Sequence, residues 1–413
     1  MHKIAIVGAG QAGLELALGL IEAGQQVTLV SNRTADQIGA GRVLTSQCMF
    51  NTALQHERDH GLNSWEQETP KLLGLSVTVG DGEGGEAIDW TVPMEHYAQS
   101  TDQRLKMSGW LKTYVERGGR LVIREAGVED LEELAADHDL VIVASGKGAI
   151  GRLFARDAGR SPFDRPMRAL AMIYVTGMLR RNDFDSVSIN IAPGVGEYVT
   201  FPALTTSGRC DIMTLEAIPG GPLDLWPKPL APEDHLEQAI RMVETFFPWE
   251  AWRCADLAPT DTNCTLAGRF APVVRKPVAT LPSGATVLGL ADTVCLNDPI
   301  AGQGSNNAAR GAEIYLRRIL DHAEGARFDV DWMEETFADY WRYAEWATAL
   351  SNALLVAPEP HVLDILTAAQ TDARVAGAVA RGFDMPSEFS PWFFEPAAAR
   401  AFLDSCARET AQS

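Results

Sequence analysis

Three glycines near the N-terminus have the spacing of a site that binds a dinucleotide. Gly8, Gly10 and Gly13 form a G-x-G-x-x-G pattern directly after an apolar run at residues 3–7. In such a loop the first glycine permits a tight turn, the second lets the backbone approach a pyrophosphate, and the third lets a helix pack closely on a strand. A helix that begins in the loop adds free N–H groups and a partial positive charge. The pattern therefore predicts a diphosphate-binding turn.

The elements that must position this turn form a β-α-β unit. Residues 3–7 and 27–30 are predicted as buried strands, and residues 11–23 as a helix with one apolar face. The acidic residue that commonly ends the second strand and binds a ribose is missing here. Three other residues stand in its place and are expected to contact the ribose and adenosine: Ser31, Asn32 and Arg33.

Two distant segments favour FAD over NAD as the dinucleotide. Residues 139–146 form an apolar run that ends in small residues, and residues 287–292 form another that ends in Asp292. A Pro-x-x-Gly-x-Gly loop within residues 297–307 follows, and a helix is predicted at 308–320. In FAD-dependent hydroxylases the strand aspartate meets the ribityl chain, and the loop presents N–H groups to the pyrimidine edge of the flavin. NAD dehydrogenases do not end in this way, so we predict FAD.

These motifs, in this order, resemble the oxygenase components of the styrene and indole monooxygenases. The resemblance implies an α/β fold with a Rossmann-type, glutathione-reductase-like FAD-binding domain, a β-sheet substrate domain and a helical C-terminal region. The stretch around Gly146 and Lys147 is more diagnostic than the glycine loop. The segments that carry the resemblance are residues 8–13, 41–44, 102–105, 145–151, 161–163 and 298–306.

The resemblance also implies the chemistry and the partners. A separate NADH:FAD reductase would supply reduced FAD, which with O₂ would form a C4a-hydroperoxyflavin. This species would epoxidise the C2–C3 bond of indole and related vinyl-aromatics such as styrene, and indole oxidation would lead to indigo. The cofactor carries this chemistry, so no side chain is expected to act as a catalytic acid or base.

The motifs and the matching segments together give a set of expected FAD-binding residues. Most lie in the glycine loop, at the end of the second strand and in the loop before the late helix. The set is Gly8, Gly10, Gln11, Ala12, Gly13, Ser31, Asn32, Arg33, Arg42, Val43, Arg104, Ser145, Gly146, Asp292, Pro299, Gly302, Gln303, Gly304, Ser305 and Asn306.

The expected pocket residues favour the indole-oxidising branch. Styrene-oxidising relatives carry Asn and His after the motif arginine, where this chain has Thr45 and Met49. Gln47 stands where they have an apolar residue, and its amide is suited to hold an indole N–H. Met and Leu side chains would provide an adaptable apolar wall. The expected substrate-contacting residues are Leu44, Thr45, Gln47, Met49, Leu72, Leu75, Ala98, Pro299 and Ala301.

The predicted organisation has three parts. Residues 1–150 and 270–330 are expected to form a discontinuous FAD-binding domain, with a substrate-binding β-sheet domain at 151–269 between them. Residues 331–413 are expected to be a helical C-terminal region. Alternating strands are predicted at 186–191 and 198–201, and helices at 232–247, 331–354, 358–369 and 396–408.

The composition narrows the classes of partner. The 413 residues carry 35 basic and 55 acidic side chains, and a net charge of −20 disfavours nucleic acid and anionic membranes. No apolar run is long enough to cross a bilayer, and the N-terminus enters a strand without signal-peptide features, so we expect a cytoplasmic protein. The six scattered cysteines are expected to be reduced core residues, and no metal site is predicted. The sequence leaves the oligomeric state undecided, with a homodimer as one alternative.

Several alternatives remain at this point. Styrene, rather than indole, is the first alternative as the native substrate. A flavin-dependent halogenase is the second, although residues 90–93 have only one of the tryptophans of the halogenase motif. A non-catalytic FAD-binding carrier is the third. The glycine-dense stretch at 80–85 is acidic and is interpreted as a surface turn instead of a second dinucleotide site.

Overall fold

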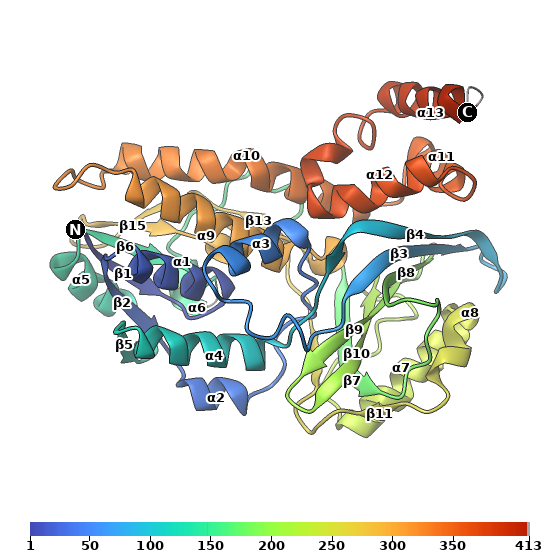
Figure 1. Cartoon of the computed structure of the whole chain (residues 1–413), viewed down its shortest axis with the longest axis horizontal. Coiled ribbons are helices and arrows are strands. Elements are labelled where there is room, and N and C mark those ends of the chain that lie inside the picture. The colour runs from blue at the N-terminus through green and yellow to red at the C-terminus, as the bar shows by residue number, and fades with distance from the viewer. Residues whose placement is uncertain (147, 411–413) are drawn as a thin grey trace.

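The computed structural model describes residues 1–146 and 148–410, arranged around two β-sheets at opposite ends of an elongated molecule (Figure 1). The sheet at the N-terminal end has six strands in the order β14-β15-β6-β1-β2-β5, and only β14 runs antiparallel to its neighbour. The central strands β6 and β1 are almost wholly apolar, as expected for strands that helices cover on both faces. The strands are β1 (Lys3–Val7), β2 (Gln26–Ser31), β5 (Arg120–Ile123), β6 (Leu140–Val143), β14 (Val278–Thr280) and β15 (Thr286–Gly289).

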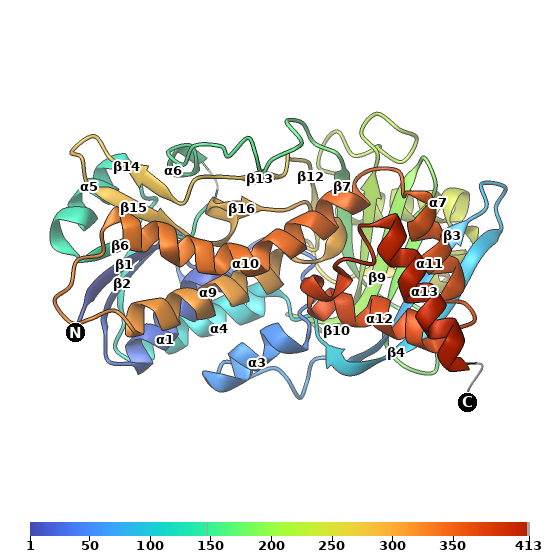
Figure 2. The same ribbon diagram turned by 90° about the horizontal axis from the view of Figure 1, so that it is seen from above.

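Helices on both faces of this sheet bury its strands. The helix after the glycine loop, α1, is buried at ten consecutive positions because it lies between the sheet and α9. Figure 2 shows α9 beside both α1 and the long helix α10. The helices of this half are α1 (Gln11–Glu22), α2 (Ala35–Gly39), α3 (Asn51–Asp59), α4 (Gln103–Glu116), α5 (Val128–Asp137), α6 (Gly148–Gly151) and α9 (Gly304–Leu320).

The second sheet has eight strands and is almost entirely antiparallel. Its order is β11-β7-β10-β9-β8-β3-β4, and β12 also pairs with β7. Helices α7 (Pro232–Phe246) and α8 (Pro248–Ala251) flank this sheet (Figure 1). The strands are β3 (Leu72–Gly80), β4 (Glu86–Ala98), β7 (Ala169–Thr176), β8 (Ser186–Ala192), β9 (Gly196–Thr205), β10 (Gly208–Ala217), β11 (Ala258–Pro259) and β12 (Thr265–Gly268).

The membership of this sheet corrects one predicted boundary. We assigned residues 1–150 to the FAD-binding unit, but the hairpin of β3 and β4 belongs to the eight-stranded sheet. The reason is a parallel ladder between β3 and β8 that extends from Gly74↔Ser186 to Val79↔Ile191. The hairpin therefore belongs to the sheet half of the molecule.

The C-terminal region is helical. It consists of α10 (Val330–Leu354), α11 (Pro360–Ala368), α12 (Ala373–Asp384), the short η4 (Pro386–Phe389) and α13 (Pro396–Thr410). Helix α12 was not predicted, and it packs against β4. Remaining short elements are β13 (Val273–Val274), β16 (Cys295–Leu296), η1 (Trp252–Cys254), η2 (Ala291–Thr293) and η3 (Pro299–Ala301).

The observed architecture confirms the predicted fold class, an α/β protein with a β-sheet half and a helical C-terminal region. All six cysteines are buried. In the described part of the chain, no helix combines the length and the apolar character that a membrane span requires.

Candidate active site

The glycine loop has the geometry of a phosphate-binding turn. Gly8 has a φ of 121°, and a Cβ there would lie 2.8 Å from the Ala144 carbonyl oxygen. A Cβ on Gly13 would lie 2.0 Å from the Gly8 carbonyl oxygen, so helix and loop touch directly. By contrast, a Cβ on Gly10 would meet no described atom within 4 Å, chain neighbours aside. The open side of Gly10 leaves room for a diphosphate.

The N-terminus of α1 points its free N–H groups into this open space. Its N-cap is Gly10, which has no side chain to satisfy them, so an anion is the natural partner. The side chain of Gln11 is directed inward, where its Nε2 donates to Glu15 (2.9 Å) and Glu57 (3.2 Å). Of the predicted residues at this turn, Gln11 can therefore serve a dinucleotide only through its backbone.

The residues at the end of β2 differ in whether their side chains are available to contact an adenosine ribose. The Ser31 hydroxyl donates to the Arg33 carbonyl (2.7 Å) and accepts from the Arg33 backbone N–H (3.2 Å), which closes a turn. Asn32 is exposed and Arg33 half-buried. The side chains available to an adenosine ribose are therefore Asn32 and Arg33, whereas Ser31 shapes the backbone.

The loop before α9 presents a second open helix N-terminus. Asp298 accepts from the Ile300 N–H (3.2 Å) and begins η3, which ends at Gly302 with a left-handed φ of 63°. Helix α9 then begins at the exposed Gly304 without a side-chain cap. The free N–H groups of this turn can stabilise negative charge on a bound flavin ring. This turn and the open space at Gly10 fit FAD.

Two further predicted FAD-binding segments, around Gly146 and Asp292, contact each other. A Cβ on Gly146 would lie 2.6 Å from the Asp292 carbonyl oxygen, so the end of β6 touches the start of the segment after β15. Ala291, before that aspartate, has a φ of 52°, the one positive value of a non-glycine residue in the described chain. Ser145 and Gly146 are half-buried, whereas Lys147 lies outside the described residues. Predicted FAD residues far apart in the sequence thus meet here.

Arg104 does not present its guanidinium to an open site. It is buried and donates to Asp102 (2.8 Å), Thr205 (2.9 Å) and both carboxylate oxygens of Asp261 (3.0 and 2.9 Å). The network joins the start of α4 to the eight-stranded sheet. We predicted direct FAD contact for Arg104, but its side chain is committed to this structural network.

Asn306 joins the predicted substrate segment to the predicted flavin loop. Its amide accepts from the Phe50 N–H (2.9 Å) and donates to the carbonyls of Cys48 (2.9 Å) and Gly302 (3.0 Å). The same segment is fixed to the other half by Val43, whose N–H donates to the Asn263 carbonyl (3.0 Å). Residues 43–50 therefore lie between the two halves of the molecule.

Four predicted substrate residues lie in one apolar cluster. Leu72, Leu75, Ala98 and Ala301 are buried in the core of the eight-stranded sheet, and Leu72 pairs directly with Ala98. The sequence analysis missed further members on the same sheet face. Strand alternation and the pairing register place Tyr174, Val187, Phe201 and Ile212 on this face. The alternating pattern of the predicted strand at 198–201 could have indicated Phe201.

The remaining predicted substrate residues are more dispersed. Met49 is buried, but it packs with Ala53, Leu54 and Ala309 instead of the sheet cluster. Leu44 is 41% exposed, and Thr45 accepts from the Tyr174 hydroxyl through its carbonyl (3.0 Å). Met49 and Leu44 therefore lie outside the apolar cluster that contains Leu72 and Leu75. Arg42 is exposed and Pro299 half-buried.

Among the described residues, Gln47 and Asn307 are the buried amides of which both polar atoms lack a hydrogen-bond partner. Gln47 is 5% exposed, and neither its Oε1 nor its Nε2 has a hydrogen-bond partner among the described residues. A buried amide without a partner costs about 1–3 kcal/mol, so this side chain is suited to bind a polar group of a ligand. Its position directly before Cys48 places it beside the Asn306 contact.

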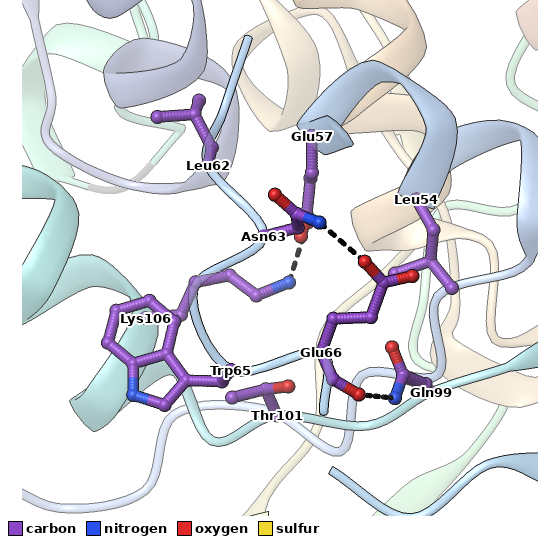
Figure 3. A pocket seen from close by; sticks show the side chains of 9 residues that line it. All are labelled: Leu54, Glu57, Leu62, Asn63, Trp65, Glu66, Gln99, Thr101 and Lys106. Atoms are coloured by element: carbon purple, nitrogen blue, oxygen red, sulfur yellow. Dashed lines mark hydrogen bonds and ion pairs between the residues drawn. The ribbon is translucent and has the colours of Figure 1, made fainter. Parts of the chain in front are cut away.

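A small cavity lies on the other side of this segment, under α3 (Figure 3). A buried ion pair between Lys106 and Glu57 (2.6 Å) lies at its wall and continues to Gln11 and Glu15. Burial, with the Glu57 carboxylate adding to its effect, raises the pKa of Glu15 to about 8, so Glu15 is protonated at neutral pH. The lining residues are Leu54, Glu57, Leu62, Asn63, Trp65, Glu66, Gln99, Thr101 and Lys106.

Helix α3, with His56 in it and His60 at its C-terminal end, is partly buried. In α3, Glu57 is buried, and His60 contacts Glu22 and Glu313 at 3.4 Å each. Within residues 1–146 and 148–410, no group of three His, Cys, Asp or Glu side chains is arranged to hold a metal ion.

Comparison with known proteins assigns the class of enzyme. The family described as "Styrene monooxygenase A putative substrate binding domain" matches residues 146–253. The styrene monooxygenase StyA of Pseudomonas fluorescens is 28% identical over 403 residues, which cover 95% of each chain. The StyA of a Pseudomonas sp. is 30% identical over 328 residues, which cover 78% of each chain. These relatives show that the chain is an FAD-dependent monooxygenase. The chain belongs to the styrene monooxygenase StyA family.

The fold is shared more widely than the family. The flavin-dependent brominase Bmp2 has a solved structure that superposes with a TM-score of 0.61 at 15% identity, over 99% of each chain. This likeness supports the fold alone, so family membership distinguishes the monooxygenase from a halogenase. As a member of this two-component family, the enzyme uses FAD and O₂ and receives reduced flavin from a separate reductase.

Proposed function

We propose that this monooxygenase epoxidises the C2–C3 bond of indole, and that styrene and related vinyl-aromatics are secondary substrates. The observation that carries this proposal is the buried amide of Gln47, whose two polar atoms have no partner among the described residues. An indole N–H would satisfy the Oε1 acceptor, whereas styrene has no donor to offer. A site built to hydrogen-bond its substrate discriminates strongly against an analogue that lacks the group.

We further propose how the chain holds FAD. Bound reduced FAD, together with O₂, supplies the oxygen atom that is transferred. The open helix N-termini of α1 and α9 would bind the diphosphate and the flavin ring, and Asn32 and Arg33 the adenosine side. The residues that we propose for these contacts are Gly8, Gly10, Gln11, Ala12, Gly13, Asn32, Arg33, Ser145, Gly146, Asp292, Pro299, Gly302, Gln303, Gly304, Ser305 and Asn306.

The apolar cluster of the sheet supports the same reaction. Oxygen transfer to an alkene needs a site that excludes water, because water otherwise consumes the reactive oxygen species. Leu72, Leu75 and Ala98 would form the wall that shields the substrate, with Ala301 on the flavin side. The role of these residues is to position and shield the indole ring, and no proton transfer by a side chain is required.

Replacement of Gln47 tests the substrate assignment. In Gln47→Leu the amide is lost at similar volume, so kcat/KM for indole is expected to fall about 10- to 100-fold, the range for loss of a buried hydrogen bond. Styrene turnover is expected to remain within about threefold, because no hydrogen bond to styrene is lost. The measurement is product formation from each substrate with the reductase in excess.

A matched control separates the amide from general effects of the substitution. Gln55 lies on the exposed face of α3, where its amide donates to Asp59 (2.7 Å), and Gln55→Leu should leave both rates unchanged. Equal losses for indole and styrene in Gln47→Leu would show that the amide packs the site and does not recognise an N–H group.

A further inference from the structure

A basic surface lies beside the proposed FAD site, in a chain that is strongly acidic as a whole. Residues 152–165 and 269–276 carry seven basic and two acidic side chains, whereas the whole chain carries 35 basic and 55 acidic ones. The first segment follows α6 and the second contains β13, and Figure 2 shows both elements along the same long edge of the molecule. Five of these residues form what we call the basic face: Arg152, Arg156, Arg160, Arg275 and Lys276.

The two segments of the basic face lie side by side. Arg156 and Arg275 are direct partners in an antiparallel bridge. Next to this bridge, the Lys276 N–H donates to the Ala155 carbonyl (2.7 Å). Cations that are more than 100 positions apart in the sequence are therefore neighbours in the fold.

Both arginines of the bridge are held by neutral acceptors. The Arg156 guanidinium donates to two backbone carbonyls (2.7 and 2.6 Å). The Arg275 guanidinium donates to the carbonyls of Asp292 (3.2 Å) and Thr293 (3.0 Å). Carbonyls carry no net charge, so both side chains remain positive. Like charges directly opposite each other on two strands destabilise the pairing, so this pair does not serve the stability of the fold.

The basic face as a whole keeps a positive charge. The carboxylate of Asp157 lies 3.0 Å from the Lys276 ammonium and 3.8 Å from the Arg160 guanidinium. One carboxylate cannot balance five cations. Arg152 and Lys276 are exposed, so this charge also acts on ions in solution.

Arg275 connects the basic face to the proposed FAD site. The Asp292 carbonyl oxygen that accepts its hydrogen bond is also the atom that a Cβ on Gly146 would approach to 2.6 Å. Gly146 and Asp292 are both among the FAD contacts proposed above. The basic face therefore extends from the edge of this site to the solvent.

The ligand that must reach this site is an anion. The enzyme receives reduced FAD from a separate reductase, and the diphosphate of FAD is negatively charged. A chain with a net charge of −20 repels such a ligand at long range. A local positive surface reverses this effect, because it raises the concentration of an anion close to the site and speeds its association.

We propose that the basic face attracts FAD through its diphosphate and thereby raises the rate at which the chain binds the cofactor. The cations act on FAD before it is bound, so they change the rate of association more than the rate of dissociation. This inference rests on the FAD site of the proposed function.

The test measures association and dissociation rate constants of oxidised FAD by stopped-flow quenching of flavin fluorescence at several salt concentrations. Salt screens both the attraction by the basic face and the repulsion by the rest of the chain. Attraction predicts that the association rate constant falls at least about tenfold between about 20 mM and about 500 mM salt. Repulsion by the acidic chain predicts the opposite sign, a rate constant that rises with salt.

Charge reversal locates the attraction on the basic face. Arg152→Glu/Lys276→Glu is expected to lower the association rate constant about tenfold at low salt and to match the wild-type chain at high salt. The dissociation rate constant should stay within about twofold. Arg152→Gln/Lys276→Gln removes the same charges without adding acids and should act in the same direction, which covers the case in which the reversed variant does not fold.

A matched control separates the basic face from net charge. Arg241→Glu/Arg400→Glu changes the net charge by the same amount at two exposed positions, on α7 and α13, which lie at the other end of the molecule (Figure 1). This variant should keep the association rate constant within about twofold of the wild-type value, because screening limits the effect of distant charges.

The outcomes separate this inference from the proposed FAD site. An association rate constant that rises with salt, or does not change, overturns the attraction. The same holds if both variants of Arg152 and Lys276 bind FAD as fast as the wild-type chain, or if the control loses as much as the reversed variant. If the wild-type chain binds no FAD at any salt concentration, the proposed FAD site itself is overturned.

Discussion

At the scale of single residues, the glycine loop separates folding from cofactor binding. Gly13 is needed by the fold, because a Cβ there would lie 2.0 Å from the Gly8 carbonyl oxygen. Gly10 has ordinary backbone angles and open space beside it, so its small size serves only a ligand. The same sequence motif thus contains two glycines with different physical roles.

Alanine substitutions at these two positions test the distinction. Gly10→Ala is expected to change the free energy of unfolding by less than about 1 kcal/mol but to weaken FAD binding at least about tenfold, because the methyl group fills the diphosphate space. Gly13→Ala is expected to lower the free energy of unfolding by more than about 2 kcal/mol, since backbone must move. Thermal denaturation without FAD and FAD titration measure both. Equal stability losses would refute this division of roles.

At this scale, the sequence motifs identified the positions of the turns more successfully than the hydrogen-bond partners of the side chains. The motifs predicted the turn at residues 8–13 and the loop near Gly302, because backbone geometry dictates glycine there. They did not indicate the buried hydrogen-bond network of Arg104, whose bonding partner Asp261 lies far along the chain. They also did not indicate that the Ser31 hydroxyl is hydrogen-bonded within a local turn. Side-chain pairing across a fold depends on tertiary distances that a motif does not contain.

At the scale of elements, His60 joins three helices. It is the C-cap of α3 and lies between Glu22 of α1 and Glu313 of α9, at 3.4 Å from each. The hydrogen bond to Glu313 is the main cause that raises the pKa of His60, and burial opposes the rise. Because α1 and α9 also supply the two open N-termini of the proposed FAD site, this contact helps to fix their spacing.

The raised pKa of His60 gives the stability a predicted pH dependence. A group whose pKa is higher in the folded state stabilises fully below its unfolded pKa, and this contribution is lost as pH rises through the folded value. His60→Asn is therefore expected to cost about 1 kcal/mol near pH 5.5 and much less near pH 9. Urea unfolding at both pH values measures this, with the exposed His96→Asn as control. A cost that does not fall toward alkaline pH would contradict the ion-pair explanation.

Elements whose stability is local were predicted well, and those that depend on packing were not. The predicted strand at 3–7 and the helices near 11–23 and 232–247 match the observed α1, α7 and β1 closely. Helix α12 was missed because its sequence contains Gly377 and Gly382, which lower helix propensity, and its contact with β4 compensates. Its length therefore reflects tertiary burial more than its own sequence.

At the scale of the whole molecule, the candidate site lies between two sheets that are joined through side-chain amides and short loops. Residues 43–50 and the loop before α9 are bonded through Asn306, and the β3–β4 hairpin extends the sheet beside them. The sequence indicated the FAD half and the sheet half but assigned the hairpin to the wrong one. Which sheet a strand joins is decided by partners distant in the sequence, here β8.

The central claim is that the chain, given reduced FAD, transfers oxygen from O₂ to indole. The most direct measurement mixes the protein with one equivalent of photoreduced FAD and aerated buffer containing indole, without NADH or reductase. Oxidised indole and released peroxide are then quantified against the FAD added, with styrene in a parallel reaction. The account predicts oxidised indole in nearly stoichiometric yield with little peroxide, because the apolar site shields the oxygen transfer from water. Oxidation of styrene alone would contradict the indole assignment, and FAD reoxidation that yields only peroxide with both substrates would contradict the account as a whole.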